Sequence, residues 1–149
     1  MAVKISGLKP IIVSPATLYL AGDSGTLVPH KFDVHFKRLT TDERDKLHAR
    51  YTLGEVLPQP ALDGVEQPPL NVPPLTDGQL LDELVEGWGG MLDEAGQPVP
   101  YSHAERKATD AVYAGLEQAM VVSWYDHAFI NQRDARVKNS KAPSSTTSA

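Results

Sequence analysis

The 149-residue chain contains no cysteine, which excludes disulfide bonds, thiolate metal ligands and a cysteine nucleophile. Long apolar runs are also missing. The N-terminal stretch that most resembles a signal peptide is interrupted by Gly7, Lys9, Pro10 and Pro15, which leaves Ile11–Val13 as its apolar centre. This is far shorter than the about 7–15 residues of a signal peptide or the about 20 residues of a membrane span. We therefore expect a soluble protein with no membrane partner.

Positive charge is scarce and unevenly placed. The net charge of −5 argues against nucleic acid as a partner. No Lys or Arg occurs between Arg50 and Arg106, whereas Asp and Glu are frequent there, and a basic cluster follows near the C-terminus: Arg133, Arg136, Lys138 and Lys141. Two interpretations remain open. The charges simply solvate the surface and the tail, or the acidic middle attracts a basic partner.

The first half of the chain contains a clear strand pattern. Phe32, Val34 and Phe36 alternate with polar residues, so their side chains lie on one face of a half-buried strand. Residues Thr17–Leu20 are rich in β-forming types and are followed by the turn signal Gly22–Gly25. We expect these two segments to pair as a β-hairpin.

Three helix starts are predicted by capping-box patterns, in which a Ser or Thr precedes a Glu or Gln by three positions. The pairs are Thr40 with Glu43, Thr76 with Gln79, and Ser102 with Glu105. The first helix is expected to reach about Tyr51, and the second to stop at Gly87. The third is expected to run to about Arg133, with Gly115 as a possible break.

A proline-rich segment separates the first two helices. Six prolines lie between Pro58 and Pro74, and proline supplies no backbone donor and fixes φ, so neither a helix nor a central strand is expected there. We predict an extended polar loop over 57–75. The whole pattern indicates one α+β domain over 1–133, a short N-terminal β-hairpin or small sheet followed by a mainly helical part, and a disordered basic and polar tail over 134–149.

The last predicted helix is apolar on nearly every side. At 100° per residue, Leu116, Met120 and Trp124 share one face, while Tyr125 and Phe129 lie on others. Such a helix must be covered on more than one side, either as a central core helix or by a partner or second copy. Because so small a chain has few elements to cover it, we favour the second alternative and predict that these five residues contact a partner.

No catalytic, cofactor or metal site is expected. His30 and His35 point to opposite faces of a strand, and the other histidines are isolated. Asp126 and His127 diverge by about 100° on a helix, with no nucleophile beside them. Gly87–Gly90 lacks the third glycine of a dinucleotide-binding loop. A small hydrolase is therefore disfavoured.

One segment resembles a known family. The run from Leu80 to Trp88, followed by Asp93–Ser102 with the sequence DEAGQPVPYS, is similar to the tail assembly chaperones of long, non-contractile-tailed bacteriophages. Those proteins carry the pattern V-x-G-W-x-G-V-x-D-E-x-G-x-P-x-P-F-S before their helices. The segment 32–40 is similar to their N-terminal half, so that the resemblance covers about 32–138. Tyr101 stands in place of the usual Phe, the proline-rich segment is extra length, and residues 1–25 match nothing in the family.

The resemblance implies a non-enzymatic role in the host cytoplasm. Such chaperones bind the tape measure protein, keep it soluble, promote its assembly with tail tube protein and are absent from the virion; many also exist in a longer form made by ribosomal frameshifting. A homo-oligomer is expected, and Trp88 is expected to be structural, packing its loop onto the helices. The alternative is a structural tail or neck component that remains in the virion, which mass spectrometry of purified particles distinguishes.

Overall fold

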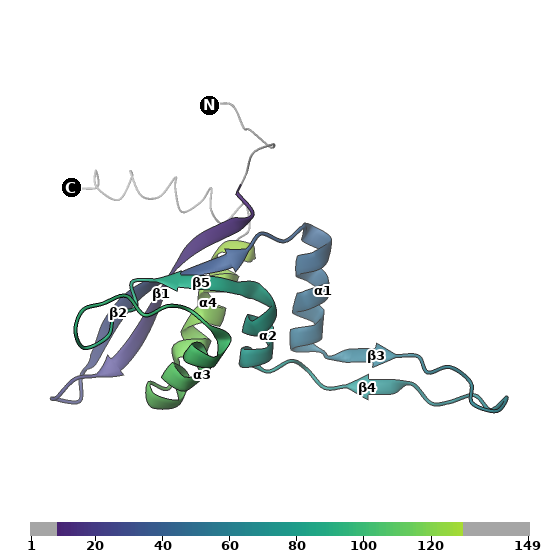
Figure 1. Cartoon of the computed structure of the whole chain (residues 1–149). Helices are drawn as coiled ribbons and strands as arrows, with labels where there is room; N and C mark the ends of the chain where they lie inside the picture. Colours follow the sequence, from purple (N-terminus) through teal and green to yellow (C-terminus); the bar gives the residue numbers. More distant parts are fainter. Residues whose placement is uncertain (1–8, 130–149) are drawn as a thin grey trace, which may run out of the picture.

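A computed structural model describes residues 9–129, and these form an α+β fold, as predicted. The elements follow in the order β1 (Ile11–Ala21), β2 (Leu27–Lys37), α1 (Thr41–Thr52), β3 (Glu55–Leu57), β4 (Leu70–Val72), α2 (Asp77–Leu84), β5 (Val85–Gly89), α3 (His103–Val112) and α4 (Leu116–Ala128). Figure 1 shows the main sheet with the helices beside it and a thin arm that leaves the body. The predicted tail, 134–149, lies outside the described residues.

The main sheet is antiparallel, with strand order β1-β2-β5. The β1–β2 pairing runs without interruption from Ile11↔Lys37 to Ala21↔Leu27, which confirms the predicted hairpin. Phe32, Val34 and Phe36 are all buried, as their alternation predicts. The sheet therefore has one inner face that belongs to the core and one outer face that points away from it.

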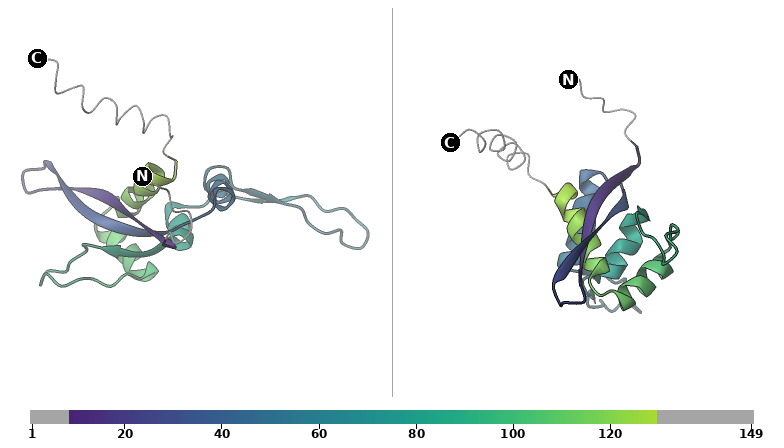
Figure 2. Two further views of the ribbon diagram at one scale, coloured as in Figure 1. Left: turned by 90° about the horizontal axis from the view of Figure 1, so that it is seen from above. Right: turned by 90° about the vertical axis from the view of Figure 1, so that its left-hand side faces the viewer.

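The helices cover the inner face of this sheet. α4 packs along β1 and also contacts α2 and α3, and Figure 2 shows the helices gathered beside the twisted hairpin. The core is one cluster drawn from the sheet, α2 and α4, with Leu80, Leu81, Leu116 and Met120 fully buried. Within 9–129, no helix combines the length and apolar character needed to cross a membrane.

The predicted caps at Thr40 and Thr76 are present. Each threonine side chain accepts a hydrogen bond from the backbone N–H three residues later, and the Glu43 or Gln79 side chain accepts one from the cap's own N–H. Ser102 forms only the first of these two bonds, with the N–H of Glu105. These local bonds satisfy backbone donors that a helix start leaves free, and they place the helices as the sequence indicates.

The predicted stop of the second helix at Gly87 is wrong. α2 ends at Leu84, and the chain enters β5 directly, where Gly87 pairs with His35 of β2. A Cβ atom at position 87 would lie 3.2 Å from Nδ1 of His35. Glycine at this position therefore allows β5 to lie close to His35 of β2. The expected break at Gly115 is confirmed, because this residue has φ 101° between α3 and α4. α4 ends at Ala128, and the positions to Arg133 lie outside the described residues.

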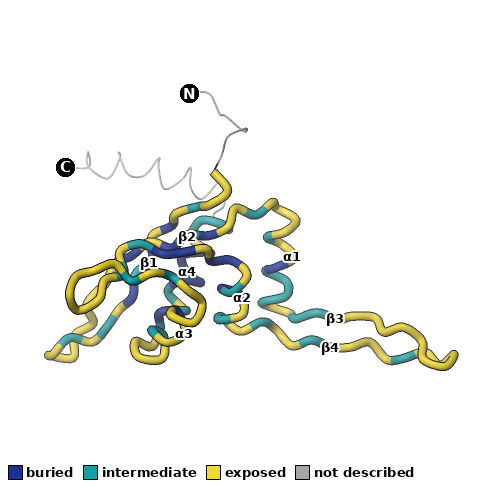
Figure 3. The backbone as a smooth tube through the Cα atoms, viewed as in Figure 1, coloured by how far each residue is buried: buried dark blue, intermediate teal, exposed yellow. Residues whose placement is uncertain are grey.

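The proline-rich segment is not a simple loop. β3 and β4 pair antiparallel, from Glu55↔Val72 to Leu57↔Leu70. At the tip, Leu62 and Val65 exchange both backbone hydrogen bonds, at 3.0 and 2.9 Å, around the turn residues Asp63 and Gly64. Both turn residues have positive φ, 52° and 74°, as a two-residue hairpin turn of type I′ requires. We call residues 54–74 the arm; Figure 3 shows it as an almost entirely exposed projection.

Candidate functional site

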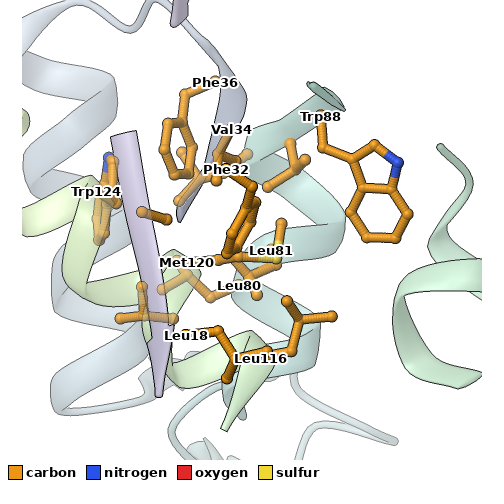
Figure 4. Close-up of a cluster of buried hydrophobic side chains, with 14 of the residues drawn as sticks. Leu18, Phe32, Val34, Phe36, Leu80, Leu81, Trp88, Leu116, Met120 and Trp124 are labelled. Atoms are coloured by element: carbon orange, nitrogen blue, oxygen red, sulfur yellow. The ribbon is translucent and has the colours of Figure 1, made fainter. Parts of the chain in front are cut away.

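The helix predicted to carry the partner surface is the centre of the protein's own core. Leu116 and Met120 have no exposed surface, and Trp124 is 2% exposed. Figure 4 shows all three among the core side chains of the sheet and α2. The prediction that these three residues contact a partner is therefore wrong. The sheet, α2 and α3 cover α4 on several sides, so the core-helix alternative holds.

Tyr125 and Phe129, the other two predicted contact residues, are half-buried and hold α1 against the end of α4. The Tyr125 hydroxyl shares a 2.8 Å hydrogen bond with Nε2 of His48, and the Phe129 ring lies 4.6 Å from the His48 ring. The Arg44 guanidinium stacks over Phe129 at 4.9 Å from the ring centroid, and it donates a hydrogen bond to the carbonyl of Ala128. These contacts give both aromatic residues a structural role.

Trp88 joins the following loop to the body, in line with its predicted packing role. Its Nε1–H donates a 2.8 Å hydrogen bond to the Val99 carbonyl, and its ring meets Tyr101 edge-on at 5.0 Å. Asp93 shapes the loop tip, because one carboxylate oxygen accepts hydrogen bonds from the N–H groups of Ala95 and Gln97. The 90–99 loop is thus a built element, held at both its base and its tip.

Below this loop, the fully buried Arg106 connects α3 to α2 and α4. It donates hydrogen bonds to Asp82 at 2.6 Å, to Glu117 at 2.8 Å and to the Tyr101 hydroxyl at 2.8 Å, and a further one to the Gly78 carbonyl. Burial alone would lower the pKa of Arg106, but the bonds to Asp82 and Glu117 raise it above its ordinary value. The Arg106 guanidinium therefore stays charged and links α2, α3 and α4 through its hydrogen bonds; we call it the hub of these three helices.

Tyr101 stands where the pattern of the tail assembly chaperones has Phe, and its hydroxyl has a partner here. A phenylalanine would leave one N–H of the buried Arg106 without this acceptor. Burial raises the pKa of Tyr101, so the phenol stays neutral and accepts the bond through its oxygen.

A hollow lies where the β1–β2 hairpin extends beyond the helices that cover the sheet. The inner face of β1 is buried as far as Leu18, beside Gly115, but Leu20 is only half-buried, and Val28 on β2 is 42% exposed. The space beyond is bounded by the hairpin, the 90–99 loop and one side of α3 with the residue that follows it, Tyr113. We call this space, about 880 Å³ in volume, the hairpin groove.

The hairpin groove has an apolar floor and a mainly acidic rim. Its floor is lined by Leu18, Leu20, Phe32, Trp88, Met91 and Val99, and Leu92 and Tyr113 stand beside it at 61% and 49% exposure. Asp93, Glu94 and Glu105 supply negative charge, against Lys31 as the one Lys or Arg of the lining. The groove therefore suits a segment that presents apolar side chains flanked by basic ones.

Residues 9–129 contain no group of three or more His, Asp or Glu side chains placed to hold a metal ion. His48, His103 and His127 serve packing and hydrogen bonding. His127, for example, faces the Phe36 ring at 5.1 Å, and burial lowers its pKa.

Sequence reasoning missed both the hairpin groove and the arm. The arm has a local signal in Asp63-Gly64, one of the dipeptides typical of type I′ hairpins. The hairpin groove has no such sequence signal, because it forms where the β1–β2 hairpin extends beyond the helices that cover the sheet. No protein-family model, curated protein or solved structure was found to match the chain.

Proposed function

We propose that this protein is a non-enzymatic tail assembly chaperone, which binds an apolar helical segment of a phage tape measure protein in the hairpin groove. The observation that carries the proposal is the position of the family-like run. Trp88, Met91, Asp93 and Val99 belong to or lie within the segment that resembles the chaperones, and all four line the groove. The most family-like part of the chain thus forms one wall of this apolar hollow.

The chemistry of the groove supports this assignment. A tape measure protein is a long helical rod whose apolar stripe aggregates unless it is covered. The floor offers apolar contact area to such a stripe, and the rim carboxylates Asp93, Glu94 and Glu105 attract basic side chains beside it. Many copies along one rod bind tightly together even when each contact is modest. Tail tube protein then replaces or joins these copies during assembly.

The test is co-expression with the tape measure protein of the same phage. We expect the wild-type chain to keep the tape measure protein in the soluble fraction. Leu92→Asp and Tyr113→Asp place a charge at exposed positions beside the groove, so we expect at least a tenfold loss of soluble tape measure protein.

The matched control is Val122→Asp. Val122 is also an exposed apolar residue, 52% exposed, but it lies on α4 near Thr17 and Tyr19 of β1, outside the lining of the hairpin groove. It should keep wild-type activity. Full solubilisation by both groove variants, measured with folded protein, would rule out the groove as the binding site.

A further inference from the structure

The arm carries apolar side chains that its own chain does not cover. Val56, Leu62 and Val65 are each more than 60% exposed, and Leu57 and Leu70 are 40% and 50% exposed. The ladder is only three residues long on each strand, and an isolated two-stranded ribbon of this kind is marginal in water. The arm is thus an apolar projection that gains stability when another surface covers it.

The outer face of the β1–β2 hairpin is a second uncovered apolar surface. Ile11, Val13 and Tyr19 point outward from β1 and are 38%, 58% and 59% exposed. They lie across from Lys37, His35 and Pro29 of β2. β1 has 11 residues and so extends over about 36 Å, while each side of the arm has a similar reach of about 30 Å. The two surfaces match in length and in apolar character.

Their charges are complementary as well. The arm contains Glu55, Asp63 and Glu66 and no Lys or Arg. Counting only carboxylates of residues 9–129, three Lys or Arg side chains of this range have none within 4.0 Å: Lys9, Lys31 and Arg38. All three lie on the β1–β2 hairpin or at its ends. Of these, Lys31 points to the outer face, because it pairs with Thr17 of β1, and it is the cation that an acidic arm would meet there.

We infer that the arm of one copy docks on the outer face of the β1–β2 hairpin of a second copy. The arm leaves the body on the side opposite to the hairpin turn, as both Figure 1 and the left view of Figure 2 show, so it points away from the hairpin of its own chain. Each copy then offers one arm and one hairpin face. Such a heterologous contact adds copies head to tail, as a ring or an open row. The inference stands independently of the hairpin groove and its occupant.

The test is complementation between two variants of the full chain. Leu62→Ser with Val65→Ser alters only the arm, and Val13→Ser with Tyr19→Ser alters only the hairpin face; all four positions are exposed. We expect the wild type to associate at micromolar concentration in sedimentation velocity. Each variant alone should be monomeric, with the dissociation constant raised about 100-fold. Mixed together, they should form 1:1 dimers and no larger species, because one intact arm meets one intact face.

The control is Val112→Ser, which removes an apolar side chain 72% exposed on α3, outside both surfaces, and should associate like the wild type. A wild type that stays monomeric, either variant that still associates on its own, or a mixture that does not dimerise would overturn the inference; association of the hairpin-face variant alone would indicate contact between two arms. An arm variant that associates normally but fails to solubilise tape measure protein would assign the arm to that partner instead. Loss of solubilisation by Leu92→Asp alone bears only on the proposed function.

Discussion

Trp124→Asp is expected to prevent folding, whereas Val122→Asp, two residues away on the same helix, is expected to leave the fold intact. Trp124 is 2% exposed, and its ring packs against Phe129 at 5.2 Å. The substitution removes a large core side chain, at a cost of about 3–5 kcal/mol, and buries a carboxylate without a partner, which adds several more. This total reaches the whole stability of a typical domain.

Circular dichroism and urea unfolding of both variants provide the measurement. Val122 is 52% exposed, so a carboxylate there remains in water and the change should stay within about 0.5 kcal/mol. A cooperative unfolding transition of Trp124→Asp near that of the wild type would mean that α4 can leave the core. That result would support the prediction from the sequence that α4 contacts a partner.

Arg106→Met is expected to lower the free energy of unfolding by about 3–5 kcal/mol at neutral pH. The side chain is fully buried, and its removal leaves Asp82 and Glu117 without the guanidinium that they share. The matched control is Lys107→Met. Lys107 also pairs with Asp82, at 3.2 Å, but its side chain is 55% exposed, so its loss should cost no more than about 1 kcal/mol.

The stability lost in Arg106→Met should depend on pH. Partial burial raises the pKa of Asp82, but the hydrogen bonds from Arg106 and Lys107 outweigh this and hold it below the ordinary value of 3.8. A carboxyl with a lowered pKa in the folded state stabilises the fold above its unfolded pKa and loses that contribution as the pH falls through the folded value. The difference between wild type and variant should therefore be complete above about pH 4 and shrink below it. Equal effects of Arg106→Met and Lys107→Met would contradict the role of Arg106 as the hub.

Patterns in the sequence correctly predicted the features of the fold that depend on residues close together in the chain. The alternation of Phe32, Val34 and Phe36, the caps at Thr40 and Thr76 and the break at Gly115 depend on backbone bonds and side-chain facing within a few residues. The prediction of a helix stop at Gly87 was wrong because a glycine after an apolar helix fits two structures, the end of a helix and the close approach of two strands. Only the pairing of β5 with β2, which brings together distant parts of the chain, decides between the two.

The candidate site was harder to predict for a similar reason. The apolar faces of α4 show that it is covered, but not whether the covering elements come from the same chain or from a partner. Here β1, α2 and α3 supply the cover. Exposed apolar surface lies instead on the arm, on the outer face of the β1–β2 hairpin and beside the hairpin groove, which forms where the helices end before the longer hairpin does. No residue pattern in the sequence marks such a difference in length.

The central claim is that the partner binds in the hairpin groove and not on α4. Hydrogen exchange measured by mass spectrometry, on the full chain with and without a soluble apolar segment of tape measure protein, tests it directly. We expect binding to slow amide exchange in the 90–99 loop, at the C-terminal end of α3 and near the β1–β2 turn. Protection confined to α4 and α1, or an unchanged exchange pattern at concentrations where the segment is bound, would contradict the claim.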